Sequence, residues 1–528
     1  MGFYVNPDEE LLKMSFKSRI YVDKSMILHE LNQVLNTEDR FVCVARPRRF
    51  GKTMAGNMIA AYYGKKANSR PILEKLKIAQ CSDFEMYLNA FNVIKFDVNA
   101  FSSKSNGKLD IVPMFTAKVR EELMEEFPDC GIKKADLLVD CIEKVYKKTK
   151  VKFVVIIDEY DVLVREKAST PIFDSYLAFL NSMFKNADLA PAFALVYLTG
   201  VFPIVRDKVQ SKLNLFREYT MTESKQLTEF VGFTEDETEA LCVQYGMEFE
   251  ECSRWYNGYK MTYRDESFDI YSPHSVVQAM ENKEFDDYWP KTGSYDSIKI
   301  YISMNFEGIK DDVKAMIAGE RIDVNIKKYI NTMTDFYSKD DVYTYLIHLG
   351  YLAYDRANKQ CYIPNHEIRS EWINAIEDDK SYAEAIRIVN NSKILLDKTV
   401  EGDAQAVADA LSAAHEQLMS KQRYNHEACL QSAIRFAYFY ANTRYTIISE
   451  LPTGKGYADV VFIPYIPSVP AMIVELKRNK TTGAALQQIK NKQYFDVMDK
   501  YQGDLLLVAV NYDEKTNEHT CEIKQYVK

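Results

Sequence analysis

The 528-residue sequence is poor in residues that build flexible linkers, and it has no apolar run of membrane length. With 19 glycines and 15 prolines, long flexible linkers are not expected. No uninterrupted apolar stretch approaches the roughly 18 residues that a membrane-spanning helix needs. Residues 1–14 also lack the basic-then-apolar order of a secretory signal. We therefore expect a cytoplasmic protein without membrane contact, and the length predicts about two to four domains.

Cysteine, histidine and positive charge are also scarce or unpatterned. The nine cysteines are scattered, odd in number and without a C-x-x-C pair, which argues against a disulfide framework or a cysteine zinc site. The seven histidines show no ligand spacing, which disfavours a histidine-based metalloenzyme. Because the net charge is −9 and the pI about 5.6, any nucleic-acid contact requires a local basic patch.

The chain is organised around residues 45–53, Ala-Arg-Pro-Arg-Arg-Phe-Gly-Lys-Thr. An apolar run at 41–44 predicts a buried strand before this stretch, and residues 54–63 predict a helix after it. Strand, loop, Gly-Lys-Thr and helix form the context of a phosphate-binding P-loop, whose backbone N–H groups attract an anion. Lys52 is expected to reach the β- and γ-phosphates of ATP, and Thr53 to ligate Mg²⁺. Arg46 stands where the full pattern has its first glycine.

Two later strand ends carry matching chemistry. A continuous apolar run at 153–157 predicts a strand buried on both faces, and it ends in Asp158 and Glu159. At this edge of an open α/β sheet, Asp158 is expected to hold Mg²⁺ and Glu159 to polarise the attacking water as a catalytic residue. A third run at 193–198 precedes Thr199, which is expected near the γ-phosphate. The predicted nucleotide-binding residues are Arg48, Arg49, Gly51, Lys52, Thr53, Asp158 and Thr199.

The order of these segments predicts an α/β fold with three parts. Alternating strands and helices from about 40 to 200 favour a parallel P-loop NTPase sheet with helices on both faces. After residue 220 the alternation fades, and a mostly helical lid is expected, with a hairpin turn at Asn257 and Gly258. Arg206 is either an arginine finger or a solvated residue. The expected domains are 1–220, 221–400 and 401–528.

The last hundred residues hold a second group of acids. Asp459 lies in a predicted strand, and Glu475 and Lys477 share one face of the next strand by alternation. Asp459 and Glu475 are expected to supply hard oxygen ligands to Mg²⁺, with Glu427 on the preceding helix completing the shell. Lys477 would steady the attacking water or the phosphate charge. The arrangement predicts a metal-dependent phosphodiesterase with Asp459, Glu475 and Lys477 as its catalytic residues. We therefore expect residues 401–528 to form a C-terminal α/β restriction-endonuclease-like domain.

Further short motifs accompany these sites: Tyr-Val-Asp-Lys at 21–24, Leu-Thr-Gly at 198–200, Trp-Tyr-Asn-Gly-Tyr at 255–259, Tyr-Ser-Pro-His-Ser at 271–275, Gly-Tyr-Ala-Asp at 456–459 and Gln-Ile at 488–489. In combination the motifs resemble a bacterial family that joins an AAA-ATPase-like domain to a PD-(D/E)XK nuclease superfamily domain. Arg46 is usual in that family. Tyr457 departs from its usual arginine, which puts one DNA contact in doubt but leaves the expected metal ligands in place.

We therefore predict an ATP-hydrolysing protein that gates Mg²⁺-dependent cleavage of nucleic acid, most readily DNA. Basic side chains near the second site would hold the phosphate backbone or form a solvated edge: Lys477, Arg478, Lys480, Lys490 and Lys492. Two alternatives remain open. The chain is a non-cleaving adaptor ATPase whose C-terminal fold binds a partner or nucleic acid, or it is a nuclease whose P-loop binds ATP without turnover. A homo-oligomer is compatible with either reading.

Overall fold

The computed structural model describes residues 2–105, 110–165, 169–204, 213–264, 266–289, 294–304, 306, 308–328, 336–377, 382–418, 427–453, 456–465, 469–491 and 504–526. Its contacts divide the chain into two compact units. The N-terminal unit comprises residues 1–290 and 323–368, and the C-terminal unit comprises 291–322 and 369–528. The domain boundaries expected at 220 and 400 stay predictions.

A five-stranded sheet in the order β2-β3-β4-β1-β5 forms the centre of the N-terminal unit, and all its pairings are parallel. Its strands are β1 (Phe41–Ala45), β2 (Asn92–Asp97), β3 (Phe153–Asp158), β4 (Phe193–Gly200) and β5 (Arg217–Tyr219). Every residue of β1, β3 and β4 is buried, as their continuous apolar runs predict for strands covered on both faces. Because β4 lies between β1 and β3, the loops after β1 and β3 open at the same edge of the sheet.

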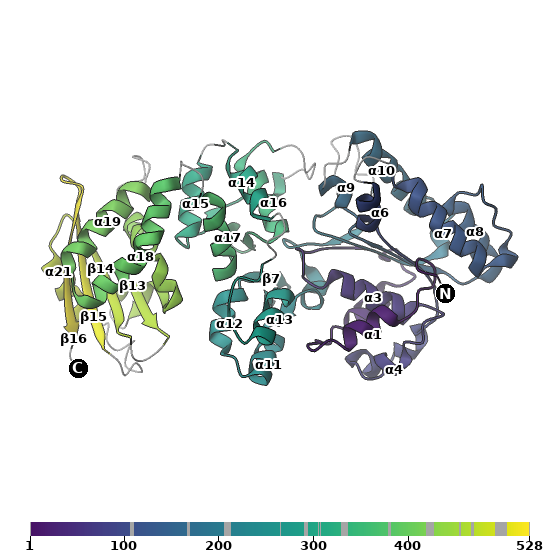
Figure 1. Ribbon diagram of the computed structural model, residues 1–528, viewed down its shortest axis with the longest axis horizontal. Coiled ribbons are helices and arrows are strands. Elements are labelled where there is room, and N and C mark those ends of the chain that lie inside the picture. Colours follow the sequence, from purple (N-terminus) through teal and green to yellow (C-terminus); the bar gives the residue numbers. More distant parts are fainter. Residues whose placement is uncertain are drawn as a thin grey trace. The chain divides into compact units, whose positions relative to one another are not determined.

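Helices cover both faces of this sheet (Figure 1). One side carries α1 (Glu10–Phe16), α3 (Lys52–Tyr63) and α4 (Arg70–Leu73). The other carries α6 (Val98–Ser105), α7 (Val112–Glu126), α8 (Leu138–Thr149), α9 (Val162–Arg165) and α10 (Thr170–Phe184). In the chain, α2 (Ile27–Val34) precedes β1, and η1 (Lys77–Gln80) and α5 (Phe84–Tyr87) follow α4. On the second side, Phe115, Val119 and Ile142 pack with Phe96 and Val155 in one apolar core. The predicted P-loop NTPase sheet with helices on both faces is therefore confirmed.

The region after residue 220 is mostly helical, as expected, but it also contains small antiparallel ladders. Its elements within the N-terminal unit are η4 (Lys225–Phe230), β6 (Phe233–Thr234), α11 (Glu235–Tyr245), α12 (Phe249–Tyr256), β7 (Tyr259–Tyr263), β8 (Glu266–Tyr271), α13 (Pro273–Asn282), α16 (Lys339–Leu349), β10 (Ala353–Asp355) and β11 (Gln360–Tyr362). The hairpin predicted at Asn257 and Gly258 is wrong. There α12 ends and β7 begins, while the hairpin joins β7 to β8. Aromatic neighbours of an Asn-Gly pair do not distinguish a helix end from a strand end.

The C-terminal unit contains a mixed five-stranded sheet in the order β12-β13-β14-β15-β16. The strands are β12 (Tyr445–Thr453), β13 (Gly456–Pro464), β14 (Ala471–Arg478), β15 (Leu505–Asp513) and β16 (Glu518–Tyr526). Its helices are α14 (Ser294–Ile302), α15 (Ile309–Ile317), α18 (Ala383–Glu401), α19 (Ala404–Leu418), α20 (Glu427–Ala437), η7 (Phe439–Thr443) and α21 (Thr482–Asn491), while β9 (Ile322–Asp323) and α17 (His366–Ile376) span the points where the chain passes between units.

Among the described pairings of this sheet, only that of β14 with β15 is parallel, and α21 forms the crossover between these two strands. Its Ala485, Leu486 and Ile489 pack against Ile473 and Leu507 of these strands. The mixed sheet with a crossover helix agrees with the predicted α/β restriction-endonuclease-like fold.

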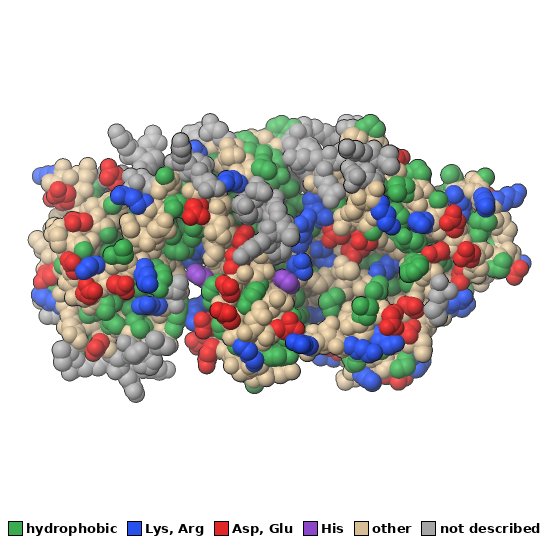
Figure 2. All heavy atoms as spheres, viewed as in Figure 1, with side chains coloured by type: hydrophobic (Ala, Val, Ile, Leu, Met, Phe, Trp, Pro, Cys, Tyr) green, Lys and Arg blue, Asp and Glu red, His purple; other side chains and the backbone are tan. Residues whose placement is uncertain are grey.

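Acidic and basic side chains are interspersed over the face shown in Figure 2. In the described part of the chain, every helix is too short or too polar to cross a membrane.

Candidate active sites

Two residues of the loop between β1 and α3 have a left-handed backbone conformation. Gly51 is the N-cap of α3 and has φ +89°, a left-handed conformation that glycine adopts without strain. A Cβ added to Gly51 would meet nothing within 4 Å, so it is backbone conformation, not space, that favours glycine. Arg49 is also left-handed, with φ +69°. Non-glycine residues in this region cost free energy, and such strain concentrates at functional sites.

Arg46 explains how the loop dispenses with the first glycine of the P-loop pattern. Its φ is not positive, so a β-carbon is compatible with the backbone there. The side chain is fully buried. Its Nη1 donates to the carbonyl oxygens of Ala45 and Tyr219, each at 3.1 Å. Burial lowers the pKa of Arg46 to about 10. The residue therefore joins the phosphate loop to β5.

Lys52 points back into the loop. Its Nζ donates to the carbonyl oxygens of Arg46 at 3.0 Å and Pro47 at 2.8 Å, and the side chain is buried. Burial lowers the pKa of Lys52, and the charge of Glu159 opposes that shift. The ammonium group is thus already removed from water and surrounded by loop carbonyls, which strengthens its attraction for a phosphate.

Three of the predicted side chains meet at the ends of β3 and β4. Thr53 hydrogen-bonds Asp158, and the Thr199 hydroxyl lies 3.5 Å from the Asp158 carboxylate. Burial raises the pKa of Asp158, and the Thr53 hydrogen bond opposes that shift. A bound divalent cation would lower it again, since a positive charge favours the ionised carboxylate. The hydroxyl of Thr53 and the carboxylate of Asp158 are oxygen donors suited to Mg²⁺.

Glu159 follows Asp158 in a left-handed conformation, with φ +51°. Its carboxylate forms an ion pair of 2.6 Å with Arg165 of α9. Burial disfavours the charged form, but the positive charges of Arg165 and Lys52 outweigh burial and lower the pKa of Glu159. Sequence reasoning did not identify Arg165 because its partner relationship depends on the turn between β3 and α9.

Sequence reasoning also missed an acid at the next strand end. Asp97 is the last residue of β2 and lies opposite Asp158 in the parallel register. Burial and the charge of Asp158 raise the pKa of Asp97. A cavity of about 140 Å³ beside it is lined by Asn57 and Lys95 as well as by the N-terminal segment. The sequence pattern predicts this strand over residues 92–96, one residue short of the observed end, and therefore does not mark Asp97 as a strand-end carboxylate.

The region after residue 220 contacts the phosphate loop directly. Phe50 packs against Tyr259 of β7 with ring centroids 5.5 Å apart. The Tyr259 hydroxyl donates to the carbonyl oxygen of Gly350 at 2.6 Å, and a Cβ on Gly350 would come within 2.9 Å of Pro47. The loop that holds Lys52 is therefore packed against the lid segments that follow α12 and α16.

The second predicted site lies at β13 and β14 of the C-terminal unit. Asp459 accepts a hydrogen bond of 2.6 Å from the backbone N–H of Leu476. Glu475 is wholly buried, and its Oε1 forms an ion pair of 2.8 Å with Lys477. Alternation along β14 puts Glu475 and Lys477 on the face where Ile473 packs against α21. The structure thus brings the three residues to one place, with hard oxygen donors beside an ammonium group.

Several predicted positions lie outside the described part of the chain. Arg206 and Lys492 are not described. Glu427 is the first residue of α20, but the described structure does not include its side chain or those of Tyr457 and Lys490. Arg48 is exposed on the phosphate loop and lowers the pKa of Glu159. The roles assigned to all these residues stay predictions.

Comparison with protein families agrees with the two predicted kinds of domain. Residues 9–210 match the family described as predicted AAA-ATPase. Residues 425–522 match the PD-(D/E)XK nuclease superfamily. The chain joins an AAA-ATPase-like domain to a PD-(D/E)XK superfamily domain. The first match contains the phosphate loop, Asp158 and Thr199, and the second contains Asp459, Glu475 and Lys477.

Similar proteins add little beyond these matches. A curated relative from Azotobacter chroococcum mcd 1, described as an uncharacterized protein in the vnfD 5′ region, is 24% identical over 52% of this chain. The match covers 51% of that relative, so the chain spans about half its length. The Aeropyrum pernix ORC2 protein aligns over 70% of the chain and 98% of its own, at 11% identity and a TM-score of 0.31. Cdc6p from Pyrobaculum aerophilum aligns over 71% and 99%, at 9% identity and a TM-score of 0.27. Scores this low carry no argument about this chain.

Proposed function

We propose that the ATPase-like domain binds and hydrolyses ATP and that its nucleotide state controls Mg²⁺-dependent cleavage of DNA by the nuclease-like domain. The observation that carries the ATPase half is the meeting of Lys52, Thr53 and Asp158 beside Glu159 at one edge of the sheet. The loop backbone and Lys52 hold the phosphates, and Thr199 positions the reacting end. Glu159 accepts a proton from the attacking water.

The nuclease half rests on the contacts among Asp459, Glu475 and Lys477. The two carboxylates hold the cation, and the N–H of Leu476 orients one of them. Lys477 contributes positive charge next to the scissile phosphate. Mg²⁺, when bound at either site, supplies charge neutralisation and a more acidic water. Basic residues on and after β14 hold the DNA backbone.

The direct packing of Phe50 on Tyr259 and of Gly350 on Pro47 supports control by nucleotide state. A phosphate that draws Lys52 away from the Arg46 and Pro47 carbonyls changes the loop on which these lid residues rest. Packed contacts of this kind convert small displacements into discrete alternative arrangements. The lid is thus the element through which the ATPase-like domain acts on the rest of the chain.

The ATPase half is tested with Glu159→Gln. We expect nucleotide binding to be kept and turnover to fall by roughly 10² to 10⁴-fold, because the amide cannot accept the proton. Phosphate release and binding of a fluorescent ATP analogue are measured on the full chain, beside Glu125→Gln on the exposed face of α7. Unchanged turnover in Glu159→Gln would rule out this role. A parent protein that binds ATP without turnover would favour the non-hydrolysing nuclease.

The nuclease half is tested with Asp459→Asn. The amide keeps an oxygen for the Leu476 N–H but loses the charge that binds the cation. We expect cleavage of linear and single-stranded DNA in Mg²⁺ or Mn²⁺ to fall at least roughly 100-fold, while Asp504→Asn, an exposed acid at the start of β15, cleaves like the parent. No cleavage by the parent in any nucleotide state, with ATP hydrolysis intact, would point to the adaptor ATPase.

A further inference from the structure

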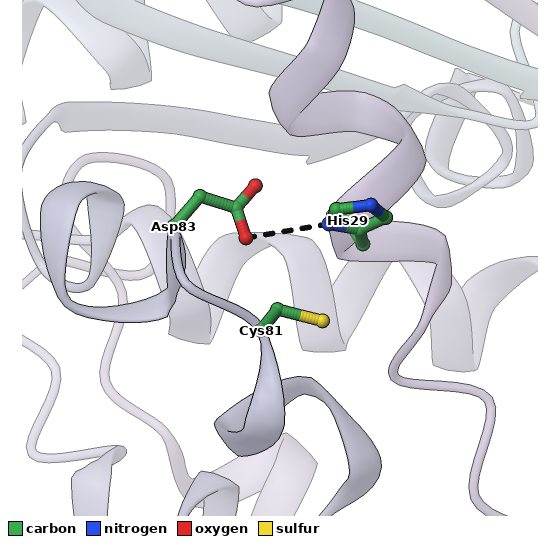
Figure 3. A group of neighbouring side chains, drawn as sticks. All are labelled: His29, Cys81 and Asp83. Carbon is green, nitrogen blue, oxygen red and sulfur yellow. Dashed lines mark hydrogen bonds and ion pairs between the residues drawn. The ribbon is translucent and has the colours of Figure 1, made fainter.

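A group of metal-ligand side chains lies in the N-terminal unit on elements that do not form the nucleotide site. His29 is on α2, while Cys81 and Asp83 lie between η1 and α5. One ligand atom from each residue lies within 4.8 Å of the other two. Figure 3 shows Cys81 and Asp83 directed toward His29 from one short segment. All three residues are half-buried, so a cation from solvent can reach them.

The distances are close to those of a tetrahedral zinc centre. Zinc ligands lie about 2.0–2.3 Å from the metal, which puts neighbouring ligand atoms roughly 3.3–3.8 Å apart. His29 Nδ1 and Asp83 Oδ1 are 3.3 Å apart. The Cys81 thiol lies 3.8 Å from the thioether sulfur of Met26. Because the three ligand atoms lie within 4.8 Å of one another, a contraction of at most about 1 Å would bring them to zinc-ligand spacing.

The orientation of Asp83 is a second observation that favours a ligand role. Asp83 occupies the N-cap position of α5, but its side chain makes no capping hydrogen bond. Its Oδ2 instead accepts from Asn32 at 3.0 Å, which directs Oδ1 toward His29. Asn32 is itself held because its amide oxygen accepts from Tyr63 of α3 at 2.7 Å. Partners that orient ligands in this way are typical of metal sites.

We propose that His29, Cys81 and Asp83 bind Zn²⁺, with a water molecule as the fourth ligand. Imidazole nitrogen, thiolate sulfur and carboxylate oxygen are the three donor types that zinc accepts, whereas Mg²⁺ avoids sulfur. Binding releases the Cys81 thiol proton to water. The site joins α2, which precedes the phosphate loop, to the segment that follows α3. A bound zinc ion would therefore cross-link two segments that lie on either side of the P-loop and α3 in the sequence.

The test is zinc binding to the full chain after chelation. It is measured by equilibrium dialysis against Zn²⁺, with Mg²⁺ in excess to occupy oxygen-only sites. We expect the parent to bind Zn²⁺ and to gain thermal stability with it. In Cys81→Ser the affinity should fall by more than roughly 100-fold, since even the partners behind zinc ligands change affinity about 10–100-fold. Cys130→Ser is the matched control, because Cys130 is another free, partly exposed thiol at the end of η2 (Pro128–Cys130).

Two further measurements distinguish loss of zinc binding from loss of folding. His29→Gln, at a side chain that is 36% exposed, should lose zinc without loss of fold even if Cys81→Ser proves unstable. Co²⁺ in the parent should give a thiolate charge-transfer absorption that disappears in Cys81→Ser and persists in Cys130→Ser. The proposal is overturned if the parent takes up no zinc, or if His29→Gln and the two cysteine variants bind it like the parent. Neither measurement uses ATP turnover as its readout.

Discussion

At the scale of single residues, the buried acid Glu367 should make the free energy of unfolding depend on pH. It is fully buried, and it accepts hydrogen bonds from Ser275 and from the Tyr288 N–H, each at 2.9 Å. Burial raises the pKa of Glu367 to about 8, whereas an unfolded chain gives about 4.3. Between these values the folded state keeps a proton that the unfolded state has lost. Its contribution to stability is therefore full below about pH 4 and is lost as the pH rises to 8.

We expect Glu367→Gln to remove this part of the pH dependence. The amide keeps an oxygen acceptor for the Tyr288 N–H and carries no charge. Free energies of unfolding from urea titrations between pH 5 and 8 should fall with pH more steeply in the parent, by up to about 1.4 kcal/mol per pH unit. Other titrating groups contribute equally to both proteins. Parallel curves for parent and variant would mean that Glu367 ionises normally in the fold.

Arg46 gives a second residue-scale prediction, because Arg46→Gly restores the usual P-loop pattern. The backbone at this position needs no glycine, and the side chain fills a buried site against Tyr219. We expect ATP affinity not to improve and the free energy of unfolding to fall by roughly 3 kcal/mol, from the cavity and the lost hydrogen bonds. Arg48→Ala, at an exposed neighbour, should change stability by less than about 0.5 kcal/mol. Tighter ATP binding by Arg46→Gly would show that Arg46 constrains the loop.

At the scale of elements, the connection between α12 and β7 depends on close packing of backbone. Gly258 has φ +115°, and a Cβ there would lie 2.1 Å from the carbonyl oxygen of Pro364. Gly246, at the end of α11, has φ +64° and open space around its Cα. The two glycines thus separate the cost of a left-handed backbone from the cost of a steric clash.

We expect Gly246→Ala to lower the free energy of unfolding by about 1 kcal/mol, the cost of a left-handed alanine. Gly258→Ala should cost roughly 3 kcal/mol or more, because the β-carbon also displaces the Pro364 backbone. Thermal or urea unfolding of the two variants measures the difference. Equal losses of unfolding free energy in the two variants would indicate that the backbone around Pro364 moves at little cost. Tyr259 follows Gly258 directly, so a displaced turn would also disturb its contact with Phe50.

At the scale of the whole molecule, the proposed function requires communication between two compact units. Lys52→Ala removes the cation that holds the phosphates, yet leaves Asp459, Glu475 and Lys477 unchanged. We expect the variant to retain metal-dependent DNA cleavage at the level of the nucleotide-free parent and to lose any response to ATP. DNA cleavage is assayed with and without ATP in the parent and in Lys52→Ala. The control variant is Lys65→Ala, at an exposed position after α3. If DNA cleavage by Lys52→Ala still responded fully to ATP, control of cleavage would not depend on this nucleotide site.

The sequence by itself determined the order of the motifs and the type of most elements. Continuous apolar runs predicted the buried strands ending at Asp158 and near Thr199, because a strand covered on both faces has no polar side. The alternation in β14 likewise predicted that Glu475 and Lys477 share a face. The local sequence pattern was enough to place site residues that lie on the same strand.

Only the tertiary structure decided which elements lie together. The position of β4 between β1 and β3, and of β2 beyond β3, brings Asp97 opposite Asp158, and pairing between distant strands leaves no local signal. The backbone at Arg46 needs no glycine because its φ is not positive, and the partner of its side chain, the Tyr219 carbonyl of β5, lies far away in the sequence. His29 and Cys81 are separated by the phosphate loop and α3, so no ligand spacing marked them. Side-chain chemistry is local, but a site is assembled by contacts between segments far apart in the chain.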